Sequence, residues 1–187
     1  MKYLIAGLGN IGPEYKNTRH NIGFQILDAL AEASNISFND KRYGFVAEYK
    51  YKARTFILLK PTTFMNLSGR AVHYWMNKEK IDIQNLLVLV DDLALPFGTL
   101  RVRAKGGAGG HNGLDNINQL LGRNDYARLR FGIGDDYPKG YQVDYVLGEW
   151  SKEEQKELPF KINDCIDIIH SFGTIGVERT MNFFNTK

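Results

Sequence analysis

The sequence lacks the features that would place it in a membrane or cross-link it covalently. Its single cysteine, Cys165, excludes an intrachain disulfide and suits a reducing compartment. No run of residues reaches the ~18–20 apolar positions that a membrane span requires. The first apolar run, Leu4-Ile5-Ala6, is too short for a signal peptide and indicates a first strand. We therefore expect a cytoplasmic protein that does not enter a membrane.

The chain also carries little net charge. A formal charge of +3 is too small by itself to imply nucleic-acid binding. The basic residues are nevertheless clustered: Arg101, Arg103 and Lys105 lie close together, and Arg123, Arg128 and Arg130 follow. This distribution favours a phosphate-bearing substrate more than the net charge does.

No internal repeat, low-complexity tract or linker divides the 187 residues, so we expect a single domain spanning residues 1–187. The continuous apolar run Leu86–Val90 is typical of a strand buried on both faces of a sheet. Phe45–Tyr49 and Thr55–Leu59 predict a hairpin, and a helix is expected over Asn21–Ala33. Strands that alternate with helices predict an α/β fold, a three-layer α/β/α domain with a mixed, mostly parallel sheet. The C-terminal helix is predicted to start at a capping box formed by Ser151 and Glu154. Pro159 predicts a kink or restart within it, and Gly173 predicts its end.

The glycines after the first strand allow a dinucleotide-binding interpretation. Gly7-Leu8-Gly9-Asn10-Ile11-Gly12 matches the G-x-G-x-x-G fingerprint, which requires a helix to open at once toward a pyrophosphate. Here a polar stretch, Pro13–His20, follows instead, and no second strand ends in an acidic residue at the expected distance. A nucleotide-dependent oxidoreductase is therefore disfavoured.

Three polar residues lie where catalytic groups are commonly found. His20 precedes a helix outside any apolar stripe, Asn66 lies at a helix entrance, and Asp91 ends the most buried strand. Their structural alternatives are a structural histidine for His20, an N-cap for Asn66, and a loop-facing carboxylate or a cap for Asp91. No serine or cysteine has a nucleophile-elbow setting, so any hydrolysis would use water as the nucleophile.

The loop Gly106–Gly113 is the most specific local feature. Many glycines before a helix can form backbone concavities that bind anions, whereas the structural alternative is a flexible loop without a ligand. A zinc site made from His20, His111, Asp91 and Asp92 is conceivable, but none of the recognised ligand spacings occurs. We expect neither a metal nor a cofactor.

Six segments, taken together and in order along the chain, resemble the bacterial-type peptidyl-tRNA hydrolase family. They are Gly7–Asn10 with Gly12 and Tyr15, Thr18–Gly23, Lys60–Gly69, Val90–Leu93, Gly109–Gly113 and Leu129–Gly134. Two positions depart from the family pattern: Ile11 stands where the family usually has proline, and Asp135-Asp136-Tyr137-Pro138 replaces a proline turn. The first bears on the geometry of a loop and the second on the rim that faces the substrate.

The resemblance implies a role for each candidate residue. It assigns His20 as the general base, Asp91 as the residue that orients it, and Asn10 as a third catalytic residue beside the scissile ester. It implies that the cationic clamp on the tRNA 5′-phosphate consists of Arg103 and Arg130. Substrate-binding roles follow for six further residues: Tyr15, Phe64, Met65, Asn66, His111 and Asn112.

The implied reaction is hydrolysis of the ester between a peptide and its tRNA, with contacts to the acceptor stem, the 3′ end and the 5′-phosphate. The implied roles of His20 and Asp91 are consistent with this reaction. A histidine can take a proton from water near neutral pH, and a carboxylate on its other nitrogen fixes the tautomer. We expect a monomer. A non-catalytic RNA-binding relative of the same fold is the main alternative, and the presence of His20, Asp91, Asn10 and Asn66 favours the enzyme.

Overall fold

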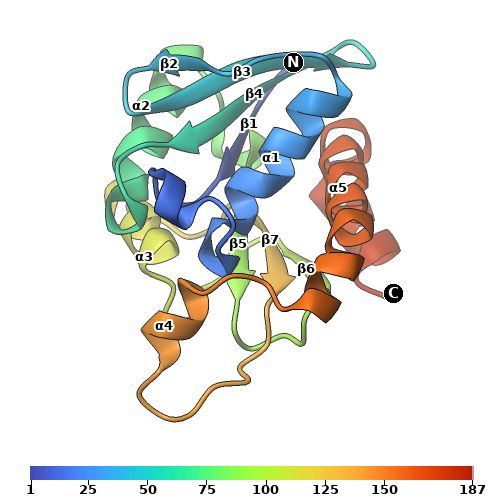
Figure 1. The fold of residues 1–187 in the computed structure, drawn as a ribbon. Coiled ribbons are helices and arrows are strands. Elements are labelled where there is room, and N and C mark those ends of the chain that lie inside the picture. Colours follow the sequence, from blue (N-terminus) through green and yellow to red (C-terminus); the bar gives the residue numbers. More distant parts are fainter. Residues whose placement is uncertain (187) are drawn as a thin grey trace.

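The computed structural model describes residues 1–186, in which helices cover both faces of a seven-stranded sheet (Figure 1). The strands are β1 (Lys2–Gly7), β2 (Asn39–Lys41), β3 (Gly44–Tyr51), β4 (Arg54–Pro61), β5 (Leu86–Asp92), β6 (Leu100–Arg103) and β7 (Ala127–Gly132). The helices are α1 (Ile22–Ala33), α2 (Ser68–Glu79), α3 (Asn112–Leu121), α4 (Gln142–Val146) and α5 (Lys152–Phe184).

The strand order is β2-β3-β4-β1-β5-β7-β6. The four central strands β4, β1, β5 and β7 are parallel, and the antiparallel pairs lie toward the two edges. Only β3 and β6 run against the direction of the other strands. The predicted three-layer fold with a mixed, mostly parallel sheet is confirmed.

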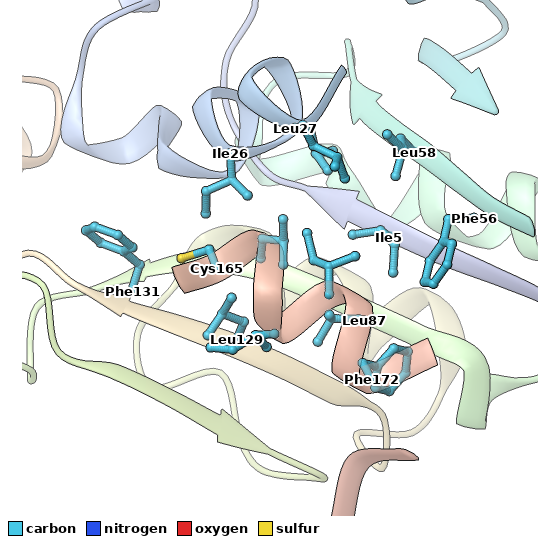
Figure 2. Packing of buried hydrophobic residues seen from close by; sticks show 14 of the residues in the cluster. Ile5, Ile26, Leu27, Phe56, Leu58, Leu87, Leu129, Phe131, Cys165 and Phe172 are labelled. Carbon is cyan, nitrogen blue, oxygen red and sulfur yellow. The ribbon is translucent and has the colours of Figure 1, made fainter. Parts of the chain in front are cut away.

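Alternate residues of each central strand enter two separate cores. Ile5, Leu87 and Leu89 face α1 and α5, where they pack with Ile26, Leu27, Cys165 and Phe172 (Figure 2). Leu4, Leu86 and Val88 face α2 and α3 on the other side of the sheet. Because neither face of β5 meets solvent, its sequence shows an unbroken apolar run instead of alternation.

The C-terminal helix differs from its prediction at Pro159 and at Gly173. The capping box of Ser151 and Glu154 is present, but α5 continues through Pro159 without a non-helical residue there, and then past Gly173. Gly173 serves close packing, since a Cβ there would lie 2.2 Å from Cζ of Phe56. The non-helical residue is Gly176, at φ 86°. None of the helices described, α5 included, is both long and apolar enough to cross a membrane.

A close backbone contact between Gly7 and Gly23 joins β1 to α1. A Cβ on Gly23 would lie 2.4 Å from the backbone nitrogen of Leu8, so α1 crosses the end of β1 at a distance that no other residue permits. The loop after β1 and the turn before α1 therefore lie side by side. Two 3₁₀ turns, η1 (Pro13–Tyr15) and η2 (Arg19–Asn21), separate Gly12 from α1. The helix that the dinucleotide interpretation requires directly after Gly12 does not form.

Candidate active site

The buried carboxylate of Asp91 is hydrogen-bonded to two histidines. Asp91 is the penultimate residue of β5, and its side chain is only 3% exposed. Oδ2 lies 2.8 Å from Nδ1 of His20, and Oδ1 lies 2.8 Å from Nε2 of His111. Each carboxylate oxygen is thus hydrogen-bonded to one imidazole, and the centroids of the His20 and His111 rings lie 5.1 Å apart. The structure brings together His20, Asp91 and His111 from three separate segments.

The tautomer of His111 follows from its position at the start of α3. His111 is the N-cap of this helix, and its Nδ1 accepts hydrogen bonds from the backbone N–H groups of Gly113 and Leu114, at 3.1 and 3.3 Å. Nδ1 must therefore carry a lone pair, and the ring proton lies on Nε2, where it is donated to Asp91. The N-cap role of His111 was not predicted from the sequence.

His20 has the opposite tautomer. An ionised carboxylate only accepts hydrogen bonds, so Nδ1 of His20 donates to Asp91 and the lone pair is left on Nε2. His20 is the middle residue of η2, and its side chain is 13% exposed. The accessible nitrogen of this histidine is the one that can take a proton.

Asp91 remains ionised despite its burial. Burial alone would raise the pKa of its carboxyl group, but the two imidazoles and their hydrogen bonds outweigh this effect and hold the pKa well below its usual range. The negative charge is thus available to stabilise a proton taken up by His20.

Asn10 is held so that its amide nitrogen remains available. Its Oδ1 accepts a hydrogen bond from the backbone nitrogen of Met65 at 2.7 Å. The buried amide of Asn21 holds the backbone of Asn10 at both groups, accepting from its N–H and donating to its carbonyl, each at 2.8 Å. Since the oxygen of Asn10 is engaged, Nδ2 is the group that can donate to a substrate.

The sequence did not single out Asn21 for this role. The sequence shows only that Asn21 lies beside His20 at the entrance of an apolar helix. Its burial, with 1% of the residue exposed, is visible only in the structure. Residues 20 and 21 thus supply a candidate base and the support of a candidate hydrogen-bond donor.

A cavity of about 570 Å³ opens beside the two histidines. Its lining includes His20, Asp91, His111 and Asn112, the glycine loop, and the basic residues Arg103, Lys105, Arg128 and Arg130. Nε of Arg130 lies 2.5 Å from Oδ2 of Asp92, so the guanidinium is held by a neighbouring carboxylate. Arg103 is exposed and forms no ion pair within residues 1–186.

Arg128 holds the glycine loop in place. The sequence analysis grouped it with the clustered basic residues, yet it is 2% exposed, and its guanidinium donates to the carbonyls of Gly106, Gly107 and Asn124 at 2.8, 3.2 and 2.7 Å. Arg128 therefore anchors the start of the glycine loop, which forms part of the cavity wall.

Five of the candidates lie outside the lining of the cavity: Asn10, Tyr15, Phe64, Met65 and Asn66. Tyr15 is half-buried in η1, whereas Asn66 is exposed within η3 (Met65–Leu67). The alternative role of Asn66 as N-cap of α2 is wrong, because Leu67 occupies that position. Phe64 is 51% exposed and has φ 62°, a strained conformation for an aromatic residue.

The cluster of His20, Asp91 and His111 has the composition of a metal site. The ligand atoms of His20, Asp91 and His111 lie within 4.8 Å of one another, whereas Asp92 is occupied with Arg130 and the backbone nitrogen of Ala94. A metal on Nε2 of His111 would have to replace the proton there, yet Nδ1 cannot take that proton while it accepts two backbone N–H groups. The capped histidine therefore fits poorly as a metal ligand.

Comparison with known proteins extends these observations to nearly the whole chain. Residues 4–187 match the family model described as peptidyl-tRNA hydrolase. A peptidyl-tRNA hydrolase of Cytophaga hutchinsonii is 60% identical and one of Bacteroides fragilis 59%, each over the full length of both chains. The crystal structure of peptidyl-tRNA hydrolase from Acinetobacter baumannii superimposes with a TM-score of 0.91 at 34% identity, covering 98% of this chain and 94% of that one. The resemblance predicted from the sequence motifs is confirmed: this chain belongs to the peptidyl-tRNA hydrolase family.

Proposed function

We propose that this chain hydrolyses the ester between a peptide and its tRNA, using a water molecule that His20 activates. The observation that carries the proposal is the hydrogen bond of 2.8 Å between Nδ1 of His20 and Asp91, because it leaves the lone pair on Nε2. Family membership supports the same reaction, since the relatives are named peptidyl-tRNA hydrolases.

The reaction begins when Nε2 of His20 takes a proton from water as the water oxygen attacks the ester carbonyl carbon. The buried charge of Asp91 stabilises the imidazolium that results. The carbonyl oxygen becomes an oxyanion, to which the free amide nitrogen of Asn10 can donate, a contribution of ~3 kcal/mol for one such donor. Collapse of the intermediate breaks the bond to the tRNA ribose oxygen, which takes the proton back from His20.

We assign the remaining candidates to substrate binding. Asn112, which lines the cavity, would contact the peptide, and Asn66 and Met65 would contribute from the neighbouring η3 segment. Phe64 and Tyr15 would contact the 3′ end of the tRNA; the exposed, strained Phe64 supports this role, because such strain tends to be retained at binding sites.

Arg103 and Arg130 would hold the 5′-phosphate of the acceptor stem. Both line the cavity that contains His20, and guanidinium groups suit bidentate contacts to phosphate. Asp92 keeps Arg130 in place before the substrate arrives. We further propose that the chain works as a monomeric single domain in the cytoplasm. The presence of His20, Asp91 and Asn10 favours this enzyme over a purely RNA-binding relative.

Replacing His20 with alanine is expected to lower kcat by about 10²–10⁴-fold, the usual cost of losing a general base. Affinity for tRNA should change little, because the phosphate contacts remain. The measurement is turnover of N-acetyl-aminoacyl-tRNA, with the exposed His73→Ala variant as the matched control. Retention of more than half the wild-type kcat by His20→Ala would contradict the assignment.

Arg103→Ala and Arg130→Ala should raise KM for tRNA substrates more than they lower kcat. Each lost phosphate contact should also reduce the slope of log affinity against log salt by roughly 0.7–0.9. A minimal substrate with the peptidyl ester but no 5′-phosphate should respond to neither change. Arg123→Ala is the control, since Arg123 pairs with Asp125 at the exposed surface. Equal losses on the full and minimal substrates would exclude a phosphate clamp.

Activity is expected to survive dialysis against a strong chelator, because the proposed steps use side chains and water alone and His111 is held as a proton donor. Turnover would be measured before and after dialysis and after zinc is added. Loss on chelation followed by recovery with zinc would replace this mechanism with one in which the His20, Asp91 and His111 cluster binds a metal.

A further inference from the structure

We propose that His111 is a positioning residue that acts through Asp91, not a residue that binds the substrate. This inference rests on the proposed role of His20 as general base. It differs from the substrate-binding role that the family resemblance implies for His111.

Neither ring nitrogen of His111 is free for a substrate. Nδ1 accepts from the backbone of Gly113 and Leu114, and Nε2 donates to Asp91. The side chain is only 8% exposed. An additional polar contact to the peptide would require breaking either the cap of α3 or the bond to Asp91.

The surroundings of the ring leave it little freedom to turn. A Cβ on Gly113 would lie 3.1 Å from Cε1 of His111 and 2.8 Å from Sδ of Met65, so the ring, the methionine and the first turn of α3 pack closely. The backbone of Met65 is in turn bound to Asn10. The position of His111 is thus set by the fold and does not depend on a ligand.

Asp91 needs this second donor. Its carboxylate is buried, and an oxygen without a partner there is costly and free to seek another hydrogen bond. With Oδ1 held by His111, Oδ2 is the oxygen that meets Nδ1 of His20. The start of α3 therefore fixes the rotation of the carboxylate, and the carboxylate fixes the tautomer and orientation of the base.

Two substitutions separate the two hydrogen-bonding roles of the His111 ring, the cap of α3 through Nδ1 and the donation to Asp91 through Nε2. In His111→Asn, the amide oxygen can cap α3, as asparagine commonly does, but the side chain is too short to reach Asp91. In His111→Gln, the longer amide can donate to Asp91, while the cap is weakened. We expect His111→Asn to keep its KM for peptidyl-tRNA but to lose about 10- to 100-fold in kcat, the equivalent of one hydrogen bond to a charged group. Its Tm should fall as well, because Oδ1 of the buried Asp91 loses its partner.

The glutamine variant is expected to separate activity from stability. Its kcat should recover to within a few-fold of wild type, whereas its Tm should fall by about 2–4 °C through the weaker cap. A merely structural role would lower Tm and kcat together in both variants. A substrate-binding role would raise KM in both. Either pattern would overturn the proposal.

A double-mutant cycle with Asp91→Asn tests whether His111 acts through Asp91. In that background, His111→Asn should lower kcat by less than about twofold further, because the carboxylate that it positions is gone. Multiplicative losses would show that His111 acts independently and would overturn the inference while leaving the general-base mechanism intact. Absence of turnover by the wild-type protein would instead overturn the proposed function and this role with it.

Discussion

The arrangement of the site depends on one buried carboxylate that accepts hydrogen bonds from two imidazoles. A charge at this depth is tolerated only when its hydrogen-bonding capacity is met, and Asp91 meets it with one histidine on each oxygen. The two histidines are not equivalent. The backbone of α3 forces one to donate through Nε2, and the other must then donate through Nδ1, which leaves a basic nitrogen facing the cavity. The chemistry of His20 thus depends on a helix cap, His111, to which the structure shows no hydrogen bond from His20.

The fold supplies the proximity on which this arrangement relies. Asp91 lies at the carboxyl end of a central strand, the usual location of sites in α/β sheets. The contact between Gly23 and the end of β1 brings the turn that carries His20 against the loop that carries Asn10. Asn21 then joins these two segments through hydrogen bonds to the backbone of Asn10. The supports on the opposite side are Arg128, which anchors the glycine loop, and His111 itself.

Much of the fold could be predicted from the sequence, because periodicity and caps are local signals. The buried run Leu86–Val90, the hairpin and the capping box at Ser151 all correspond to observed elements. The short elements β2 and α4 were missed, since three to five residues carry too little periodicity to be recognised. Gly173 was misread as a helix end because its packing against Phe56 connects residues far apart in the sequence.

The site could be predicted only as a set of residues. Motif order pointed to His20, Asp91 and Asn10, but no sequence pattern reveals which nitrogen a proton occupies. The cap at His111, the amide clamp of Asn21 and the burial of Arg128 all depend on tertiary contacts. For Arg128 the local pattern gave no sign of burial, because it lies two residues before the half-buried Arg130 on the same strand, within a cluster of basic residues.

The central claim concerns the protons on two imidazole rings, and nitrogen NMR of the histidine side chains tests it most directly. In ¹⁵N-labelled protein, at a pH where both rings are neutral, the account predicts opposite tautomers. His20 should carry its proton on Nδ1 and His111 on Nε2, with assignments made by comparison with His20→Ala and His111→Asn. A proton on Nε2 of His20, or on Nδ1 of His111, would contradict the account.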